Sequence, residues 1–225
     1  MIEPYPRIPH LAPGPGITPD DLVLDVVARE RLLGGPVRVE EKLDGANVGL
    51  WLDEHGAVQV ASRGGPGAMD RAGQLGRLRA WAAQRTDALA ALLTGGRTLY
   101  AEWLWLRHGI RYDRLPDLMI GLDVRRPDGS FAPVDERDRV LARAGIAGPP
   151  LVTEGRVATV EAVDALLGPA RYASGAAAEG VVVRSLSGDR LVAKRIRSGF
   201  VQRSDAEWAG AREHNAVAPA PTATS

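Results

Sequence analysis

The sequence contains no cysteine and very little lysine. Without cysteine the chain can form neither a disulfide framework nor a thiolate metal site, so a reducing cytoplasm is the expected location. There is also no basic, apolar N-terminal leader and no apolar run long enough to cross a bilayer, so we expect a soluble protein with no membrane partner. A formal net charge of zero disfavours a protein that coats nucleic acid, although it leaves room for a local basic groove.

The two lysines stand out because arginine is plentiful. Lys42 and Lys194 are the only lysines among 28 lysine and arginine residues. A guanidinium stays protonated, whereas an amine can lose its proton and attack an electrophile. Lowering a lysine pKa from about 10.4 to about 7–8 costs about 4 kcal/mol, and Lys194 is a candidate for the nearby cation that lowers the pKa of Lys42. Both lysines could equally be solvated surface charges, which is the commoner role.

The strongest local pattern surrounds Lys42. Residues 37–40 alternate between apolar and charged side chains, which predicts a strand that runs into Lys42. Asp44-Gly45 is a turn signal, and residues 48–52 are typical of a return strand. This pattern predicts a hairpin that holds Lys42 beside a tight turn, where a nucleophile can be presented.

The rest of the chain indicates one domain of mixed secondary structure. Prolines and glycines over residues 1–19 predict an extended arm. Further strands are expected at 57–61, 97–106, 118–124, 151–152, 179–184 and 191–195. Helices are expected at 19–33 after an N-cap at Thr18, at 70–93 with a break near 86–87, at 135–144 and at 159–167. No repeat or composition break suggests a second domain, so we expect one domain over residues 1–212 and a disordered tail over 213–225.

Several short segments together resemble a known enzyme superfamily. Lys42-Leu-Asp-Gly45 resembles the nucleotidyltransferase motif of ATP-dependent polynucleotide ligases and mRNA capping enzymes, in which the lysine becomes covalently joined to a nucleoside monophosphate. Residues 100–104, 118–124, 179–184 and 191–195 resemble the later motifs of that superfamily, in the same order. Residues 5–10 and 198–208 resemble the two ends of a bacterial RNA-ligase-like branch. Over residues 5–208 the chain therefore resembles the ATP-dependent RNA ligase family.

This resemblance implies a fold and a set of site residues. The fold would be an α+β nucleotidyltransferase (ligase adenylation) domain of twisted antiparallel sheets flanked by helices, with ATP between them. Lys42 would be the nucleophile, Lys194 would bind the α-phosphate, Glu102 the ribose hydroxyls and Glu179 the metal ion, Mg²⁺ or Mn²⁺. The implied catalytic residues are Lys42 and Lys194, and the implied nucleotide-binding residues are Glu40, Glu41, Lys42, Asp44, Gly45, Arg63, Glu102, Leu122, Glu179 and Lys194.

The sequence departs from the family pattern at two places. The aromatic residue that usually stacks on the purine is replaced, since the aligned position is Leu122 or Met119. A second cation is also missing from the last motif, because strand alternation places Ile196 at its position and turns Arg195 and Arg197 to the other face. Base stacking and one phosphate contact are therefore unassigned.

The implied reaction is ATP-dependent RNA ligation. Lys42 would form lysyl-AMP, AMP would pass to a 5′-phosphate end of RNA, and a 3′-hydroxyl would then seal the strand. RNA is preferred to DNA because little chain follows Trp208 to form the oligonucleotide-binding barrel that DNA ligases and capping enzymes usually append. The alternatives are a minimal ATP-dependent DNA ligase, an enzyme acting on nicked duplexes, and a module that binds nucleotides or nucleic-acid ends without sealing them.

Overall fold

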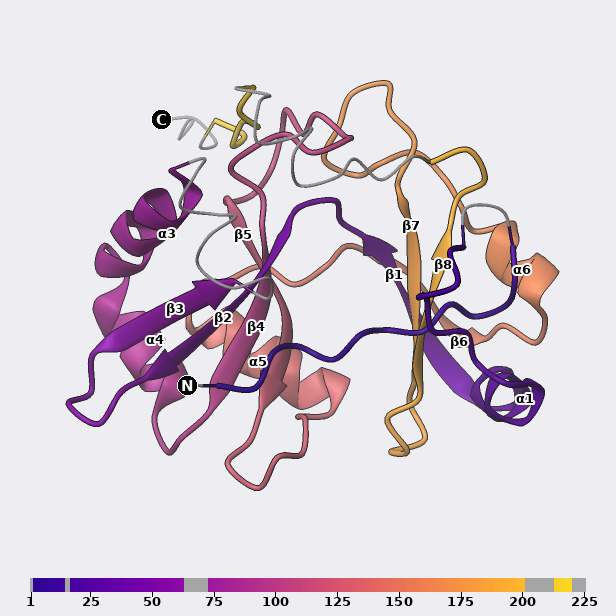
Figure 1. The fold of residues 1–225 in the computed structure, drawn as a ribbon, viewed down its shortest axis with the longest axis horizontal. Helices are drawn as coiled ribbons and strands as arrows, with labels where there is room; N and C mark the ends of the chain where they lie inside the picture. The colour runs from indigo at the N-terminus through magenta and orange to yellow at the C-terminus, as the bar shows by residue number, and fades with distance from the viewer. Residues whose placement is uncertain (1, 15–16, 63–72, 201–212, 220–225) are drawn as a thin grey trace, which may run out of the picture.

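The chain forms two antiparallel sheets that lie side by side (Figure 1). The computed structural model describes residues 2–14, 17–62, 73–200 and 213–219. The first sheet has the order β6-β1-β7-β8 and the second the order β3-β2-β4-β5. The strands are β1 (Pro36–Lys42), β2 (Ala46–Leu52), β3 (Val58–Ser62), β4 (Thr98–Trp103), β5 (Met119–Arg125), β6 (Leu151–Arg156), β7 (Gly180–Ser185) and β8 (Val192–Ile196).

Helices cover the outer side of each sheet. The helices are α1 (Val26–Gly34), α3 (Gln74–Ala83), α4 (Thr86–Leu93), α5 (Val134–Arg143) and α6 (Val160–Asp164). Figure 1 shows α3, α4 and α5 against the second sheet and α1 and α6 beside the first. The predicted α+β fold of twisted antiparallel sheets flanked by helices is confirmed. Within the described residues, no helix is both long enough and apolar enough to cross a bilayer.

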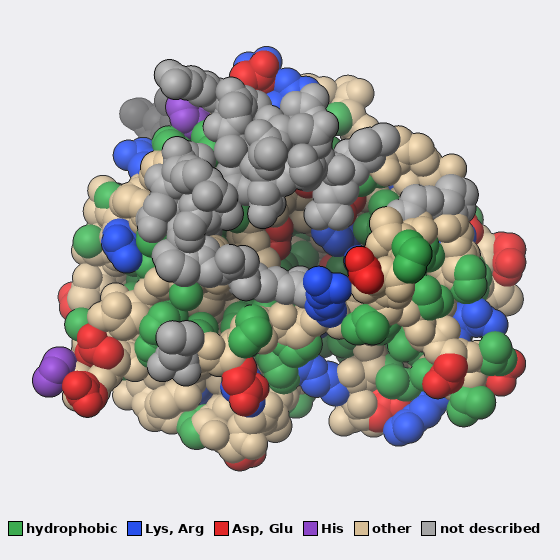
Figure 2. Space-filling model, viewed as in Figure 1, with side chains coloured by type: hydrophobic (Ala, Val, Ile, Leu, Met, Phe, Trp, Pro, Cys, Tyr) green, Lys and Arg blue, Asp and Glu red, His purple; other side chains and the backbone are tan. Residues whose placement is uncertain are grey.

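Each sheet has its own apolar core. Alternating residues of β2 and β4, such as Leu50 and Leu99, pack with Leu78 of α3 and Leu89 of α4. A second cluster joins β1 and β7 to α1, and a third fills the space among the loops around Tyr112. Acidic and basic side chains are visible in the space between the two halves of the molecule (Figure 2).

The predicted hairpin at Lys42 is wrong. β1 pairs with β6 and β7, whereas β2 pairs with β3 and β4, so the two strands belong to different sheets. The segment 43–45 is therefore a crossing between sheets. The Asp44-Gly45 pattern was misleading because an Asp-Gly pair permits a tight bend of any kind. Which strands pair depends instead on packing against residues that are distant in the sequence.

The boundaries of α1 and α6 differ from the sequence prediction. α1 begins at Val26, where the Asp25 carboxylate accepts a hydrogen bond from the Ala28 N–H as N-cap. The helix does not start near residue 20, because residues 22–24 form backbone hydrogen bonds with His10. The break predicted near 86–87 is confirmed between α3 and α4. Thr159 caps α6 as predicted, although that helix ends at Asp164.

The N-terminal arm connects the two sheets (Figure 1). At one end, the Tyr100 hydroxyl donates to the Glu3 carbonyl at 2.6 Å, and the Tyr5 hydroxyl donates to Asp123. At the other end, Lys194 of β8 exchanges backbone hydrogen bonds of 2.8 Å with Pro9 and Leu11. The arm is ordered because its backbone groups find partners on both sheets.

The predicted tail disorder does not hold for residues 213–219. Asn215 is buried, and its side-chain amide donates to the carbonyls of Leu104 and Leu106 at 2.9 and 3.1 Å. Its amide oxygen accepts from the Tyr112 N–H at 2.8 Å. The Ala/Pro/Thr composition gave no sign of this docking, which depends on the buried Asn215 side chain and on backbone hydrogen bonds of residues 213, 216 and 218.

Candidate active site between the two sheets

An ion pair between Lys42 and Glu179 forms the centre of the site. Lys42 ends β1, and its neighbour in register is Gly180, the first residue of β7. The Lys42 Nζ lies 2.8 Å from both oxygens of Glu179, whose side chain is 3% exposed. A Cβ at residue 180 would lie 2.2 Å from the Arg195 carbonyl oxygen. Glycine therefore lets β8 approach β7 closely, next to the carboxylate.

The second sheet contributes Glu102. This residue lies on β4, and its Oε1 accepts a hydrogen bond of 3.1 Å from the Gly45 N–H. A Cβ at residue 45 would lie 2.6 Å from a Leu104 methyl carbon and 2.7 Å from the Trp103 carbonyl oxygen. The Asp-Gly pair is thus needed for the chain to pass directly against β4, which brings Glu102 of one sheet to Lys42 of the other.

The charges in this cluster shift one another's pKa values. Burial opposes the charged form of Lys42, but Glu179, Glu102 and Asp44 outweigh it and raise the lysine pKa. Burial raises the pKa of Glu102 to about 7, with Lys42 opposing the shift and Glu179 adding to it. Burial likewise raises the pKa of Glu179. The sequence predicted a lowered Lys42 pKa, but the carboxylates of Glu179, Glu102 and Asp44 reverse the direction of this shift.

Lys194 reaches the same site from β8. Burial and the positive charge of Lys42 lower its pKa, and Asp21 and Glu179 oppose the shift. Its Nζ lies 3.6 Å from Asp21, which also lies 3.6 Å from the buried His10 side chain. The structure thus brings the chain's two lysines close enough to influence each other, with the N-terminal arm holding Lys194 in place.

Asp44 organises the loop that follows β4. Its Oδ2 accepts hydrogen bonds from the Gly109 N–H at 2.6 Å and the Ile110 N–H at 2.9 Å. The Asp44 N–H donates to the Tyr112 hydroxyl at 2.9 Å. Loop 107–113 is therefore attached to the Lys42 segment, a connection that no local pattern in the sequence indicated.

Glu40 lies in a buried ionic network rather than at an open binding surface. Its side chain is 1% exposed and pairs with Arg137 of α5 and Arg184 of β7. Arg184 also binds Asp123 of β5 at 2.9 Å. Burial raises the Glu40 pKa, but the two arginines outweigh it and lower the pKa overall. Because both carboxylate oxygens are engaged, Glu40 joins the two sheets; the arginine partners were not foreseen from the sequence.

Four other residues were predicted from the sequence, and three of them lie within the described part of the chain. Glu41 accepts a hydrogen bond of 2.9 Å from the Arg171 N–H through Oε2, while its buried Oε1 has no partner among the described residues. Of the two candidates for base stacking, Met119 is part of the apolar core, whereas Leu122 is half-buried on β5. Arg63 lies outside the described residues.

The arginines that follow Lys194 turn away from the cluster. Arg195 forms an ion pair with Asp164 of α6, with oxygen distances of 2.6 and 2.7 Å. Arg197 Nε donates to the Ala178 carbonyl at 3.1 Å. Neither supplies a second cation beside Lys194.

The residues fit a divalent cation that is held jointly with a nucleotide. Within the described part of the chain, no group of three or more histidine, aspartate and glutamate side chains could hold a metal alone. Mg²⁺ commonly binds one or two protein carboxylates together with substrate phosphates. Glu179 and Glu102 are buried carboxylates with raised pKa values, as expected where positive charge is in short supply.

Comparison with known proteins agrees with this arrangement. The RNA ligase family matches residues 35–196, from the start of β1 to the end of β8. No curated protein matches the sequence. The matched span contains Lys42, Glu102, Glu179 and Lys194.

Solved structures of ligases share the fold. A mutant of Naegleria gruberi RNA ligase with ATP and Mn has a TM-score of 0.58 at 17% identity, covering 74% of this chain and 51% of that one. A putative ATP-dependent DNA ligase from Aquifex aeolicus has a TM-score of 0.56 at 19% identity, covering 88% and 50%. An archaeal ATP-dependent RNA ligase has a TM-score of 0.53 at 21% identity, covering 88% and 49%. The chain thus spans about half the length of each, and such identities establish the fold alone.

Proposed function

Because the chain belongs to the RNA ligase family, we propose that it is an ATP-dependent RNA ligase whose nucleophile is Lys42. The observation that carries the proposal is the convergence of Lys42, Glu179 and Glu102 from two different sheets. In a chain with 26 arginines and two lysines, one of the lysines stands at this position, and an amine can become a neutral nucleophile there whereas a guanidinium cannot.

The first step is attack of the Lys42 amine on the α-phosphorus of ATP. A nitrogen–phosphorus bond forms, the bond to the pyrophosphate oxygen breaks, and the lysine loses a proton. Since its raised pKa keeps Lys42 protonated in the ligand-free protein, its ion pair with Glu179 must be exchanged before attack. Lys194, whose pKa is lowered, contributes positive charge to the α-phosphate oxygens.

The carboxylates have separate roles. Glu102 accepts hydrogen bonds from the two ribose hydroxyls, for which an ionised carboxylate has enough acceptor sites. Glu179 would hold the divalent cation together with the ATP phosphates. When bound there, Mg²⁺ or Mn²⁺ would supply positive charge to the phosphoryl oxygens and compete with Lys42 for the carboxylate.

Base recognition is assigned to residues around the end of β1. The buried, unpartnered Oε1 of Glu41 is an acceptor suited to the exocyclic amine of adenine. Leu122 is the apolar side chain of β5 that remains available to cover the base, since Met119 is in the core. Glu40 acts by holding β1 against β5 and β7, and does not touch the nucleotide.

Two further steps complete ligation. The 5′-phosphate of an RNA end attacks lysyl-AMP, so a phosphorus–oxygen bond forms, the nitrogen–phosphorus bond breaks and Lys42 regains its proton. A 3′-hydroxyl then attacks the activated 5′-phosphate, releases AMP and leaves a phosphodiester bond. A minimal DNA ligase remains the alternative, because the fold is also that of the Aquifex aeolicus protein described as a putative DNA ligase.

The test uses matched RNA and DNA ends. The purified chain is incubated with ATP, Mg²⁺ and a 5′-phosphorylated strand, either single or at a nick, with Lys42→Ala as the control. We expect adenylylated and sealed RNA from the wild type and neither product from the variant. Preferential sealing of DNA would move the assignment to the DNA ligase. Retention of ends without AMP transfer would instead identify a binding module.

A further inference from the structure

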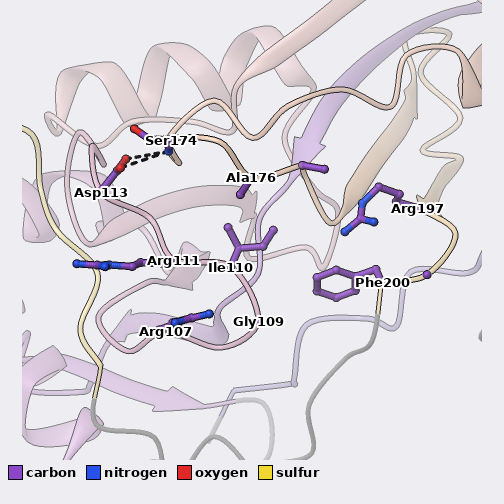
Figure 3. Close-up of a pocket in the computed structure, with 11 residues that line it drawn as sticks. Arg107, Gly109, Ile110, Arg111, Asp113, Ser174, Ala176, Arg197 and Phe200 are labelled. Carbon is purple, nitrogen blue, oxygen red and sulfur yellow. Dashed lines mark hydrogen bonds between the residues drawn. The ribbon is translucent and has the colours of Figure 1, made fainter.

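A groove of about 730 Å³ opens beside the proposed nucleotide site (Figure 3). Its walls are the loop after β4, the loop before β7 and the segment after β8. The volume lies within the range of about 300–1,000 Å³ that is usual for pockets holding molecules of nucleotide size or larger. None of the roles assigned above to Lys42, Glu102, Glu179 or Lys194 uses this groove.

Arginines from distant parts of the sequence line the groove. Figure 3 shows Arg107 and Arg111 on one side and Arg197 on the other. Among the described residues, neither Arg111 nor Arg197 forms an ion pair, whereas Arg107 pairs with Glu213. The acidic residue of the lining is Asp113, whose carboxylate accepts hydrogen bonds from the Ser174 N–H at 3.1 and 3.3 Å. Counting only the residues that the structure describes, the groove therefore carries net positive charge, with the guanidinium groups of Arg111 and Arg197 outside any ion pair.

An aromatic ring completes the lining. Phe200 lies beside Arg197 in Figure 3, with the guanidinium carbon 5.9 Å from the ring centroid. A phenyl face next to arginines can stack on a base of any sequence while the arginines bind backbone phosphates. A site for a small inorganic anion would have no need for this ring or for so large a volume.

A hydrogen bond and close packing attach the groove to the Lys42 segment. Gly109 donates its N–H to Asp44 at 2.6 Å, and a Cβ at residue 109 would lie 3.0 Å from the same carboxylate oxygen and 3.3 Å from the Phe200 ring. Glycine thus allows the loop to fit between Asp44 and Phe200. A strand lying in the groove would be held at a fixed position next to the residue that flanks the nucleophile.

We propose that this groove binds a single-stranded polynucleotide next to the end being activated. Arg111 and Arg197 bind its phosphates, and Phe200 stacks on one base. The inference rests on the proposed function, which requires a strand beside lysyl-AMP, and it adds the surface that holds that strand. RNA and DNA share the phosphodiester backbone and the bases, so the test includes both.

The experiment measures strand binding and adenylylation separately. Fluorescence anisotropy of a 5′-phosphorylated, 3′-labelled single strand of about 12 nucleotides is followed with the full chain, without ATP or divalent metal. The variants are Arg111→Ala, Arg197→Ala and Phe200→Leu, which keeps apolar volume without a ring. Arg143→Ala is the matched control, because this exposed arginine at the end of α5 does not line the groove.

We expect each groove variant to weaken binding about fivefold or more, and each arginine variant to reduce the slope of log affinity against log salt by about 0.7. Arg143→Ala should bind like the wild type. Affinity in Arg111→Ala and Arg197→Ala equal to that of the control would overturn the proposal. So would displacement of the RNA by polyglutamate as readily as by unlabelled RNA, because the groove would then recognise acidic chains in general.

Adenylylation of the same proteins, measured by intact mass after incubation with ATP and Mg²⁺, separates the two hypotheses. An adduct on the wild type together with arginine-dependent strand binding supports both. No adduct on the wild type contradicts the ligase assignment, while arginine-dependent binding would still support the groove as a strand-binding site.

Discussion

Replacing Glu102 with glutamine should stabilise the ligand-free protein at alkaline pH. This carboxylate is buried, and burial raises its pKa from 4.5 to about 7 despite the opposing charge of Lys42. The folded state then binds more protons than the unfolded state between these two values. Wild-type stability is therefore lost as pH rises through this window, because the buried carboxylate must ionise. Glutamine keeps the shape and removes that cost.

The magnitude follows from the shift. A rise of the Glu102 pKa from 4.5 to about 7 corresponds to about 3.4 kcal/mol of lost stability when the carboxylate is fully ionised in both the folded and the unfolded state. About 2 kcal/mol of this total develops between about pH 5.5 and about pH 8.5. The stability gained by Glu102→Gln should therefore be about 2 kcal/mol larger at the higher pH than at the lower.

Urea unfolding of the wild type and Glu102→Gln at these two pH values measures the difference. Glu54→Gln is the matched control, because that side chain is 86% exposed on the turn between β2 and β3. A gain that is the same at both pH values, or a loss at the higher one, would refute the description of Glu102 as a carboxylate held in an electrostatically unfavourable position. The same variant should also use ATP poorly, because the carboxylate whose ionisation destabilises the fold is the proposed acceptor for the ribose hydroxyls.

Three further predictions concern other parts of the molecule. Glu40→Gln should cost about 3–5 kcal/mol in urea unfolding, because it removes the buried negative charge that Arg137 and Arg184 share, whereas Glu154→Gln on exposed β6 should cost under about 1 kcal/mol. Asn215→Ala should cost about 1–3 kcal/mol and speed proteolysis near residue 213, since buried groups lose three hydrogen bonds. The rate of adenylylation should rise with pH from about pH 6 to about pH 9, because the raised pKa of Lys42 keeps the amine protonated.

Each of these has a clear contrary result. Equal losses in Glu40→Gln and Glu154→Gln would contradict a buried network that joins the sheets. Unchanged stability in Asn215→Ala would contradict docking of residues 213–219. A rate that is flat or falls with pH would mean that another group, and not the lysine proton, controls the first step.

The sequence predicted the positions of most helices and strands but few of their packing and pairing partners. Strand and helix positions such as β4 and the α3–α4 break follow from local periodicity, which the chain expresses directly. The pairing of β1 does not follow from local periodicity. Whether β1 pairs with β2 or with β7 depends on packing between residues about 140 positions apart in the sequence. The supposed hairpin failed for this reason.

Short motifs in the sequence indicated four residues of the candidate site. They predict Lys42, Glu102, Glu179 and Lys194, and the structure brings the charges of these residues close enough to shift one another's pKa values. The role of Glu40 was not predictable, since its partners Arg137 and Arg184 are surface-type residues by composition and become a buried network only in the fold. The hydrogen bonds between Asp44 and loop 107–113 were not predicted either, because they too form only in the fold.

The central claim is that Lys42 forms a covalent bond with AMP, and peptide mapping by mass spectrometry tests it most directly. The wild type, Lys42→Ala and Lys42→Arg are each incubated with ATP and Mg²⁺ or with GTP and Mg²⁺, and the modified peptide is sequenced. We predict an adenylyl group on Lys42 of the wild type from ATP, and none on either variant, because arginine keeps the charge but cannot act as the nucleophile. An adenylyl group on Lys194 or on any other residue, or an adduct that forms from GTP alone, would contradict the account.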